Sequence, residues 1–293
     1  MYYYKQDGAV SKIYTLPPVK EAEGQDDIYP VINSDRLILD QTLDYYAGCL
    51  SENDRAQAFL LSRGIYSEAA IEHFRLGFSD RTLGLTLKKM DKLQEACSRG
   101  SLQRLGLLKP SGHEFFRGAI VFPFIGETGE VIGGYGRRIT PKLSAGAVYH
   151  VHWYGEELGF FNQQVLLDGK SMILCKNPIE ALSWWSNGFQ NVMGLMGIYN
   201  FEQEHLTKLK VHRIKQVYLA FGSQQNELEA AWFIARQLSQ AGIEPKFILY
   251  PNGIDANALV QLADDPQQAL QQCLDNALVF AKYLPIHRIE VRR

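Results

Sequence analysis

The sequence is poor in cysteine and has no long apolar run, and these two absences exclude several classes of protein. Its four cysteines are Cys49, Cys97, Cys175 and Cys273. No two of them form a C-x-x-C pair, so the usual zinc-finger spacing is excluded, and scattered cysteines suit a reducing compartment. No segment approaches the roughly 18 apolar residues of a membrane helix, and the N-terminus lacks the pattern of a secretory signal. We therefore expect a cytoplasmic protein without a membrane partner.

An excess of charge of one sign is also absent. Thirty basic and 32 acidic side chains give a formal net charge of −2. Any binding to nucleic acid must therefore come from a local basic patch rather than from the overall charge. The length of 293 residues and the hydrophobic share of 46% are those of a globular protein with room for two modest domains.

The first half of the chain divides into an arm and a mixed lobe. Residues 1–35 contain prolines and an acidic cluster, which predict an irregular N-terminal arm. Residues 36–168 begin with helical periodicity, in which Ser34 or Asp35 caps the first helix and Ser67 opens the third. Two β-rich runs then flank the turn "GETGE", which indicates a hairpin. We expect these residues to form a mixed α+β N-lobe.

The second half of the chain alternates strands and helices. Residues 169–262 contain four apolar runs, each followed by an amphipathic segment, which predicts a mostly parallel sheet flanked by helices. Residues 263–293 predict a C-terminal helix over "DPQQALQQCLDNALVFAKYL" and a basic tail. The predicted fold class is therefore α/β, with the mixed N-lobe preceding the lobe that holds the parallel sheet.

Two ordered groups of motifs resemble the catalytic core of bacterial-type DNA primases over about residues 36–265. "YYAGCL…AFLLSRGIYSEAAIEHFRLGFS" is similar to the primase pattern of a helix, "RGI", an "I…F" helix and "LGF". "FRGAIVFPFIGETGEVIGGYGRRI" is similar to the primase pattern "R…FPI.D..G.VIGFGGR". The chain resembles most closely the primase-like proteins of mobile elements that carry a TOPRIM domain.

The TOPRIM resemblance includes departures at the positions of the metal-binding carboxylates. In the family, the first strand ends in a Glu-Gly-like turn followed by "DAL", and here Lys176-Asn177 and Glu180 occupy those places. The family's Asp-x-Asp after a later strand is replaced in "LAFGSQQNELEAA" by Gly222 and Gln224. The last family element, "P.G.D.N", is retained as Pro251, Gly253, Asp255 and Asn257.

These departures predict a degenerate metal site. Mg²⁺ prefers hard oxygen ligands in a near-octahedral shell, and the family uses it for in-line displacement on a triphosphate. A protonated Lys176 repels the ion, Gly222 has no side chain, and Gln224 is a neutral, weaker donor. We therefore expect no bound cofactor. Three roles are open for Lys176: it neutralises Asp255 or Glu180 in place of the metal, it contacts a phosphate, or it is a solvated surface lysine.

A second set of basic residues points to nucleic acid. The resemblance implies that the arginines matching Arg117 and Arg137 line a template and nucleotide cleft, and Arg138, Lys142 and Lys176 extend this predicted set. The planar fork of arginine suits phosphate because it makes paired hydrogen bonds. The alternative is that they are ordinary surface residues on a hairpin.

The leading functional prediction is a catalytically degenerate primase-like protein. It binds single-stranded DNA or RNA and serves, with a protein partner, in a DNA replication, mobile-element or phage-defence complex. The alternative is an active Mg²⁺-dependent primase or nucleotidyl transferase with a site rebuilt from Glu180, Asp255 and Glu227. A third hypothesis is a protein-interaction module without nucleic-acid binding.

The resemblance also implies a zinc-binding module before the core and a helicase-docking domain after it. Residues 1–35 contain no cysteine, and few residues follow the TOPRIM-like part. We therefore expect the sequence to represent the primase core alone.

Overall fold

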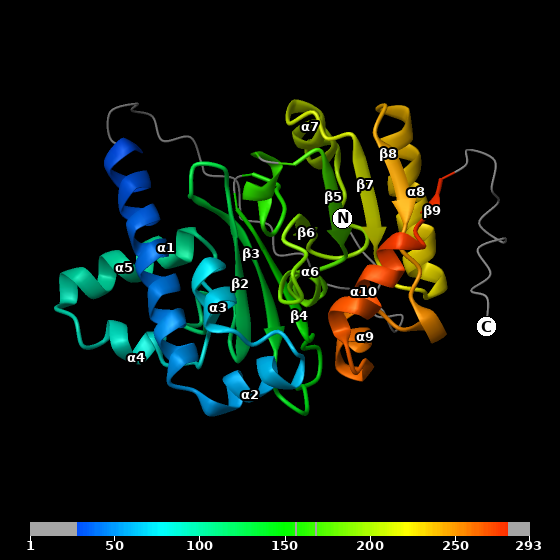
Figure 1. Cartoon of the computed structure of the whole chain (residues 1–293). Helices are drawn as coiled ribbons and strands as arrows, with labels where there is room; N and C mark the ends of the chain where they lie inside the picture. The colour runs from blue at the N-terminus through cyan, green and yellow to red at the C-terminus, as the bar shows by residue number, and fades with distance from the viewer. Residues whose placement is uncertain (1–27, 156, 168, 281–293) are drawn as a thin grey trace. The chain divides into compact units, whose positions relative to one another are not determined.

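The computed structural model describes residues 28–155, 157–167 and 169–280 (Figure 1). The chain divides into two compact units. The first unit comprises the described residues up to Phe59, Ile71–Pro123 and Val131–Glu157. The second comprises Leu60–Ala70, Phe124–Glu130 and the described residues from Leu158 onward. The predicted segment boundaries stay a prediction, and the N-terminal arm up to residue 27 and the basic tail from residue 281 lie outside the described residues.

Within the described residues, five helices precede the first long strand, as the helical periodicity predicts. They are α1 (Ile28–Ser51), α2 (Asp54–Ser62), α3 (Glu68–His73), α4 (Leu83–Leu87) and α5 (Lys92–Arg104). The predicted cap of the third helix is confirmed, because the Ser67 hydroxyl accepts the backbone N–H of Ala70 at 3.0 Å. The first helix starts at Ile28 rather than at the predicted cap Ser34 or Asp35, so the last residues of the predicted arm are helical.

A four-stranded sheet belongs mainly to the first unit. Its strands are β1 (Gly77–Phe78), β2 (Ala119–Ile125), β3 (Val131–Arg138) and β4 (His150–Tyr154), in the order β1-β2-β3-β4. The predicted hairpin joins β2 and β3, and Gly126 N–H donates to the Glu130 carbonyl at 2.7 Å across its turn. A core of buried side chains from α1, α4, α5 and the sheet, including Tyr46, Leu102, Phe116 and Trp153, stabilises this unit.

A five-stranded sheet forms the centre of the second unit. Its strands are β5 (Ser171–Cys175), β6 (Val192–Gly194), β7 (Gln216–Ala220), β8 (Glu244–Phe247) and β9 (Leu278–Val279), in the order β6-β5-β7-β8-β9. The pairings from β6 to β8 are parallel, and β9 pairs antiparallel with β8. The predicted fold class, α/β with a mostly parallel sheet flanked by helices, is confirmed.

Helices cover both faces of this sheet. They are α6 (Pro178–Trp185), α7 (Gln203–Val211), α8 (Gln225–Gln240), α9 (Ala256–Leu262) and α10 (Pro266–Asp275). Leu209 of α7 and Ile234 of α8 join one core with Leu174 and Leu219 of the strands. α6 packs against β5, β6 and α9.

The predicted C-terminal helix is too long. α10 ends at Asp275, and the following residues form the edge strand β9 instead. The packing of Phe280 accounts for the early end of the helix. Its ring contacts Trp232 and Phe247 and packs on the core, and a helix continued beyond Asp275 would prevent these contacts. No helix in the described part of the chain is long and apolar enough to span a membrane.

Candidate functional site

The candidate site lies where the order of the parallel strands reverses. From β5 the chain reaches β6 on one side, and it then returns to β7 on the other side of β5. The loops that leave the carboxyl ends of strands at such a point diverge, and α/β proteins place ligands there. Lys176 directly follows β5, and Gly222 is the second residue after β7. The strand order alone therefore brings these two predicted positions to one place.

The turn after β5 is built as a helix cap. The side chain of Asn177 accepts the backbone N–H of Glu180 at 3.1 Å, and Pro178 follows in the first turn of α6. Both features stabilise a helix N-terminus, because the first N–H groups of a helix lack partners within it. Asn177 thus has a local structural role, and it fixes where Lys176 leaves the strand.

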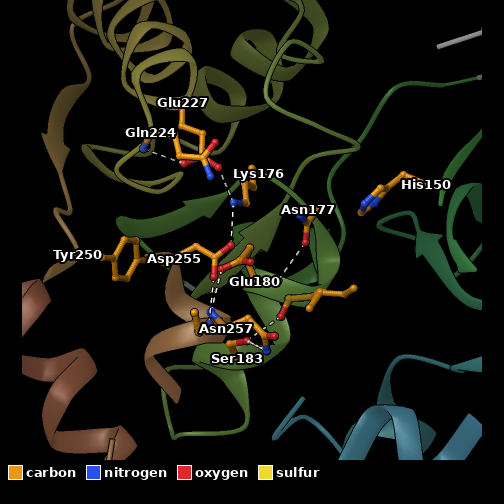
Figure 2. A network of polar contacts seen from close by, with 12 residues as sticks. His150, Lys176, Asn177, Glu180, Ser183, Gln224, Glu227, Tyr250, Asp255 and Asn257 are labelled. Atoms are coloured by element: carbon orange, nitrogen blue, oxygen red, sulfur yellow. Dashed lines mark hydrogen bonds and ion pairs between the residues drawn. The ribbon is translucent and has the colours of Figure 1, made fainter. Parts of the chain in front are cut away.

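Lys176 is buried and bonded to two carboxylates, as Figure 2 shows. Its side chain is 7% exposed, and Nζ lies 2.6 Å from Glu227 Oε1 and 3.0 Å from Asp255 Oδ2. The reading of Lys176 as a solvated surface lysine is therefore wrong, and the predicted pairing with Asp255 is confirmed. Burial by itself lowers the pKa of Lys176, but the charges of Glu180, Asp255 and Glu227 outweigh it and raise that pKa. The ammonium consequently keeps its proton.

The carboxylate of Glu227 fills the space next to Gly222. Gly222 has φ +122°, and a Cβ atom added there would lie 2.1 Å from Glu227 Oε2. The same oxygen accepts the backbone N–H of Gln224 at 3.1 Å, which caps the start of α8. A side chain at position 222 would therefore clash with the carboxylate of Glu227 in its present position. The space beside Gly222 is thus occupied by a carboxylate from the first turn of α8.

Gln224 itself lies on the surface at the start of α8. Its backbone N–H donates to Glu227, so the residue at this predicted metal position acts as the N-cap of α8. Sequence reasoning missed this local role of Glu227, although a Glu at the third position of a helix is one half of the capping-box signal.

Glu180 and Asp255 complete the charged cluster. Glu180 is 4% exposed, and its Oε2 accepts the backbone N–H of Asn257 at 3.0 Å. Burial raises the pKa of Glu180 to about 8; the charge of Lys176 opposes this shift and that of Asp255 adds to it. Burial alone would raise the pKa of Asp255. The charge of Lys176 and the hydrogen bond from the Ala258 N–H outweigh burial, so the pKa of Asp255 is lowered. At neutral pH the cluster therefore holds a cationic Lys176, an anionic Asp255 and a largely protonated Glu180.

Asn257 ties this cluster to the surrounding helices. Its Nδ2 donates to the Arg63 carbonyl and to Ser183 Oγ, both at 2.8 Å, and its Oδ1 accepts from Arg63 Nη1 at 3.0 Å. The preceding Asp255 caps α9 by accepting Ala258 N–H at 3.0 Å. The retained "P.G.D.N" element therefore serves the local fold through buried hydrogen bonds.

The cluster does not fit a magnesium ion while Lys176 is protonated. The ammonium already lies within hydrogen-bond distance of Glu227 and Asp255, and its charge opposes a second cation between them. In the described ranges no group of three or more His, Cys, Asp or Glu side chains is arranged to hold a metal.

The structure divides the predicted nucleic-acid-binding residues between the two units. Arg117, Arg137, Arg138 and Lys142 belong to the first unit, and Lys176 belongs to the second. Arg117 is exposed just before β2. The guanidinium of Arg137 lies 4.5 Å from the ring centroid of Tyr149, and Arg138 Nη1 donates to the Val148 carbonyl at 2.6 Å. Lys142 accepts a hydrogen bond from Thr140 through its carbonyl, which leaves its ammonium out of that contact.

Comparison with known protein families agrees with this architecture. Residues 45–147 match the family of the DNA primase catalytic core, N-terminal domain, and residues 173–260 match the Toprim-like family. The chain therefore carries a DnaG-type primase core N-terminal domain followed by a Toprim-like domain.

Two bacterial DNA primases are similar to most of this chain. The protein of Geobacillus stearothermophilus is 22% identical over 272 residues, and that of Campylobacter jejuni is 24% identical over 260 residues. These alignments cover 87% and 85% of this chain but 43% and 41% of the relatives. The chain thus spans about two fifths of the length of these relatives.

Solved primase structures share the fold. The Aquifex aeolicus primase, with zinc-binding and RNA polymerase domains, matches with a TM-score of 0.73 at 20% identity, over 85% of this chain and 62% of that one. A DNA primase domain from Pseudomonas aeruginosa matches with a TM-score of 0.70 at 20% identity, over 85% of this chain and 81% of that one. A DnaG catalytic domain bound to ssDNA matches with a TM-score of 0.68 at 16% identity, over 86% of this chain and 83% of that one.

Proposed function

We propose that this chain is a catalytically degenerate primase-like protein that binds single-stranded DNA or RNA. It acts in the cytoplasm as a subunit or scaffold of a DNA replication, mobile-element or phage-defence complex, and a protein partner supplies the catalytic activity. The single observation that carries the loss of catalysis is the Lys176 ammonium, held at 2.6 and 3.0 Å by Glu227 and Asp255. A tethered cation at this point opposes a divalent ion, and the ion is what the family uses to hold a triphosphate.

The nucleic-acid role is supported by the first unit. Its hairpin carries Arg117, Arg137 and Arg138 around one end of the four-stranded sheet, and guanidinium groups suit phosphate oxygens. A solved structural neighbour with the same fold is a DnaG catalytic domain bound to ssDNA. The free cysteines within the described residues suit a reducing compartment.

The binding test is a charge reversal at Arg117 and Arg137. Fluorescence anisotropy with labelled single-stranded DNA and RNA should give a loss of affinity of tenfold or more for Arg117→Glu/Arg137→Glu, because two phosphate contacts become repulsive. Lys89→Glu is the matched control, because it reverses an exposed charge in the same unit. Equal affinity of the double variant and the wild type would refute this binding surface.

The second candidate function is an active Mg²⁺-dependent nucleotidyl transferase. The observation that favours it is the gathering of three carboxyl groups, from Glu180, Glu227 and Asp255, around Lys176. It requires that Lys176 leave the cluster or lose its proton. Primer synthesis that depends on Mg²⁺ and disappears in Asp255→Ala would select this alternative.

A further inference from the structure

Three arginines converge on one end of the four-stranded sheet in the first unit. There the Ile139 N–H donates to the Gly118 carbonyl at 3.1 Å, which joins the end of β3 to the start of β2. Arg55 of α2 donates from Nη2 to the Ile139 carbonyl at 2.9 Å. Arg81 Nη2 lies 2.9 Å from the point where a Cβ on Gly118 would be, and Arg117 is the residue before Gly118. Segments far apart in the sequence thus bring the guanidinium groups of Arg55 and Arg81 to the end of the sheet at which Arg117 precedes β2.

The charge of these three arginines is not balanced by acids. Other arginines of the same unit are paired, as Arg75 is with Asp40 and Asp44 at 2.9 Å each. Within the described ranges, Arg55, Arg81 and Arg117 form no ion pair, and all three are exposed. A local excess of positive charge on a chain of net charge −2 is the electrostatic pattern of a phosphate-binding surface.

The acids nearest to Arg81 and Arg117 along the chain are Asp80 and Glu114, and both are engaged in other hydrogen bonds. Asp80 Oδ1 accepts from Thr82 N–H at 2.9 Å and from Thr82 Oγ1 at 2.6 Å. Glu114 is buried and accepts from Ser79 Oγ at 2.6 Å and from Leu83 N–H at 3.1 Å. Neither carboxylate is thus placed by these bonds to neutralise the three arginines.

The backbone at Arg81 adds an independent observation. Arg81 has φ +81°, a region that non-glycine residues rarely adopt and that carries strain. Gly118 has φ +73° and leaves the space in which the Arg81 guanidinium lies. The strained backbone and the missing Cβ together hold the guanidinium next to Arg117, and strain of this kind is concentrated at binding sites.

We propose that Arg55, Arg81 and Arg117 form a binding site for the phosphodiester backbone of a single strand. The proposal rests on the proposed nucleic-acid function and assigns two residues, Arg55 and Arg81, that the sequence patterns did not indicate. A guanidinium has five N–H donors, so the bond from Arg55 to the Ile139 carbonyl leaves donors for phosphate oxygens. Because phosphate is shared by DNA and RNA, the site binds both.

The salt dependence of binding tests this site. Affinity for a labelled oligothymidylate and an oligouridylate of about 20 nucleotides is measured by anisotropy over a range of NaCl concentrations. Each lost phosphate contact on a single strand reduces the slope of log K against log salt by about 0.7. We expect Arg55→Gln/Arg81→Gln to reduce the slope by about 1.4 on both oligonucleotides, and Arg55→Lys/Arg81→Lys to retain most of it.

The controls separate this proposal from the proposed function. Arg75→Gln removes a paired arginine of the same unit and should leave the slope unchanged. A wild-type slope in Arg55→Gln/Arg81→Gln, together with lost affinity in Arg117→Glu/Arg137→Glu, would overturn this site alone. If the wild-type chain binds neither oligonucleotide, the proposed function and this site are both overturned. Retained thermal stability of the variants shows that the effect arises at the surface.

Discussion

Replacing Lys176 by methionine removes one charge from a buried cluster while keeping a side chain of similar length. Glu227, whose side chain is 2% exposed, would then lose its cationic partner. Removing one member of a buried ion pair costs about 3–5 kcal/mol, because the remaining charge is desolvated and uncompensated. We therefore expect Lys176→Met to lower the free energy of unfolding by about 3–5 kcal/mol, measured by urea denaturation at pH 7.

The same assay contains its own control. Glu227→Gln in the Lys176→Met background removes the uncompensated charge and keeps a similar shape, so it should restore part of the lost stability. The two substitutions should thus be non-additive, as expected for residues in direct contact. A loss below about 1 kcal/mol in Lys176→Met, or additive effects in the double variant, would refute the view that Lys176 neutralises this cluster.

Three further predictions follow from the same cluster. Gly222→Ala should destabilise the protein in urea by several kcal/mol more than Gly253→Ala, because a Cβ at 222 would lie 2.1 Å from a Glu227 oxygen whereas Gly253 has open space; equal losses would contradict this. Burial raises the pKa of Glu180 to about 8, so the folded state keeps a proton that the unfolded chain loses above about pH 4.5, and stability should fall as pH rises through this window. Glu180→Gln should flatten that decline in urea midpoints measured from pH 5 to 8, and an unchanged profile would contradict the shift. Asn257→Ala should lower the free energy of unfolding by about 1–3 kcal/mol, since the Arg63 carbonyl and Ser183 lose their buried partner. A loss of only about 0.3 kcal/mol would exclude a stabilising role for these hydrogen bonds.

Local patterns in the sequence were sufficient where neighbouring residues decide the structure. The cap at Ser67, the turn between β2 and β3, and the alternation of strands and helices from β5 to β8 all follow from short-range preferences. Gly64 follows α2 with φ +65°, the left-handed conformation that glycine commonly adopts after a helix. The ends of the first and last helices were less accurate, because residues 28–33 extend α1 and Phe280 draws the chain into the edge of the sheet.

The candidate site was predicted in part. The family pattern predicts that Lys176, Gly222 and Asp255 are neighbours at one metal position, and the pairing of Lys176 with Asp255 is present. The pattern did not reveal that Glu227 fills the space beside Gly222, because that contact depends on the three-dimensional path from β7 into α8. The convergence of Arg55 and Arg81 near Gly118 likewise joins distant segments, and no local periodicity encodes it.

The most direct test of the central claim is calorimetric titration of Mg²⁺ and Mn²⁺ into the protein, combined with primer synthesis on single-stranded DNA. The positive charge of Lys176 between Glu227 and Asp255 predicts neither metal binding nor product, while single-stranded DNA or RNA is still bound. Metal binding together with primer synthesis, both lost in Asp255→Ala, would contradict the account and establish an active, rebuilt site.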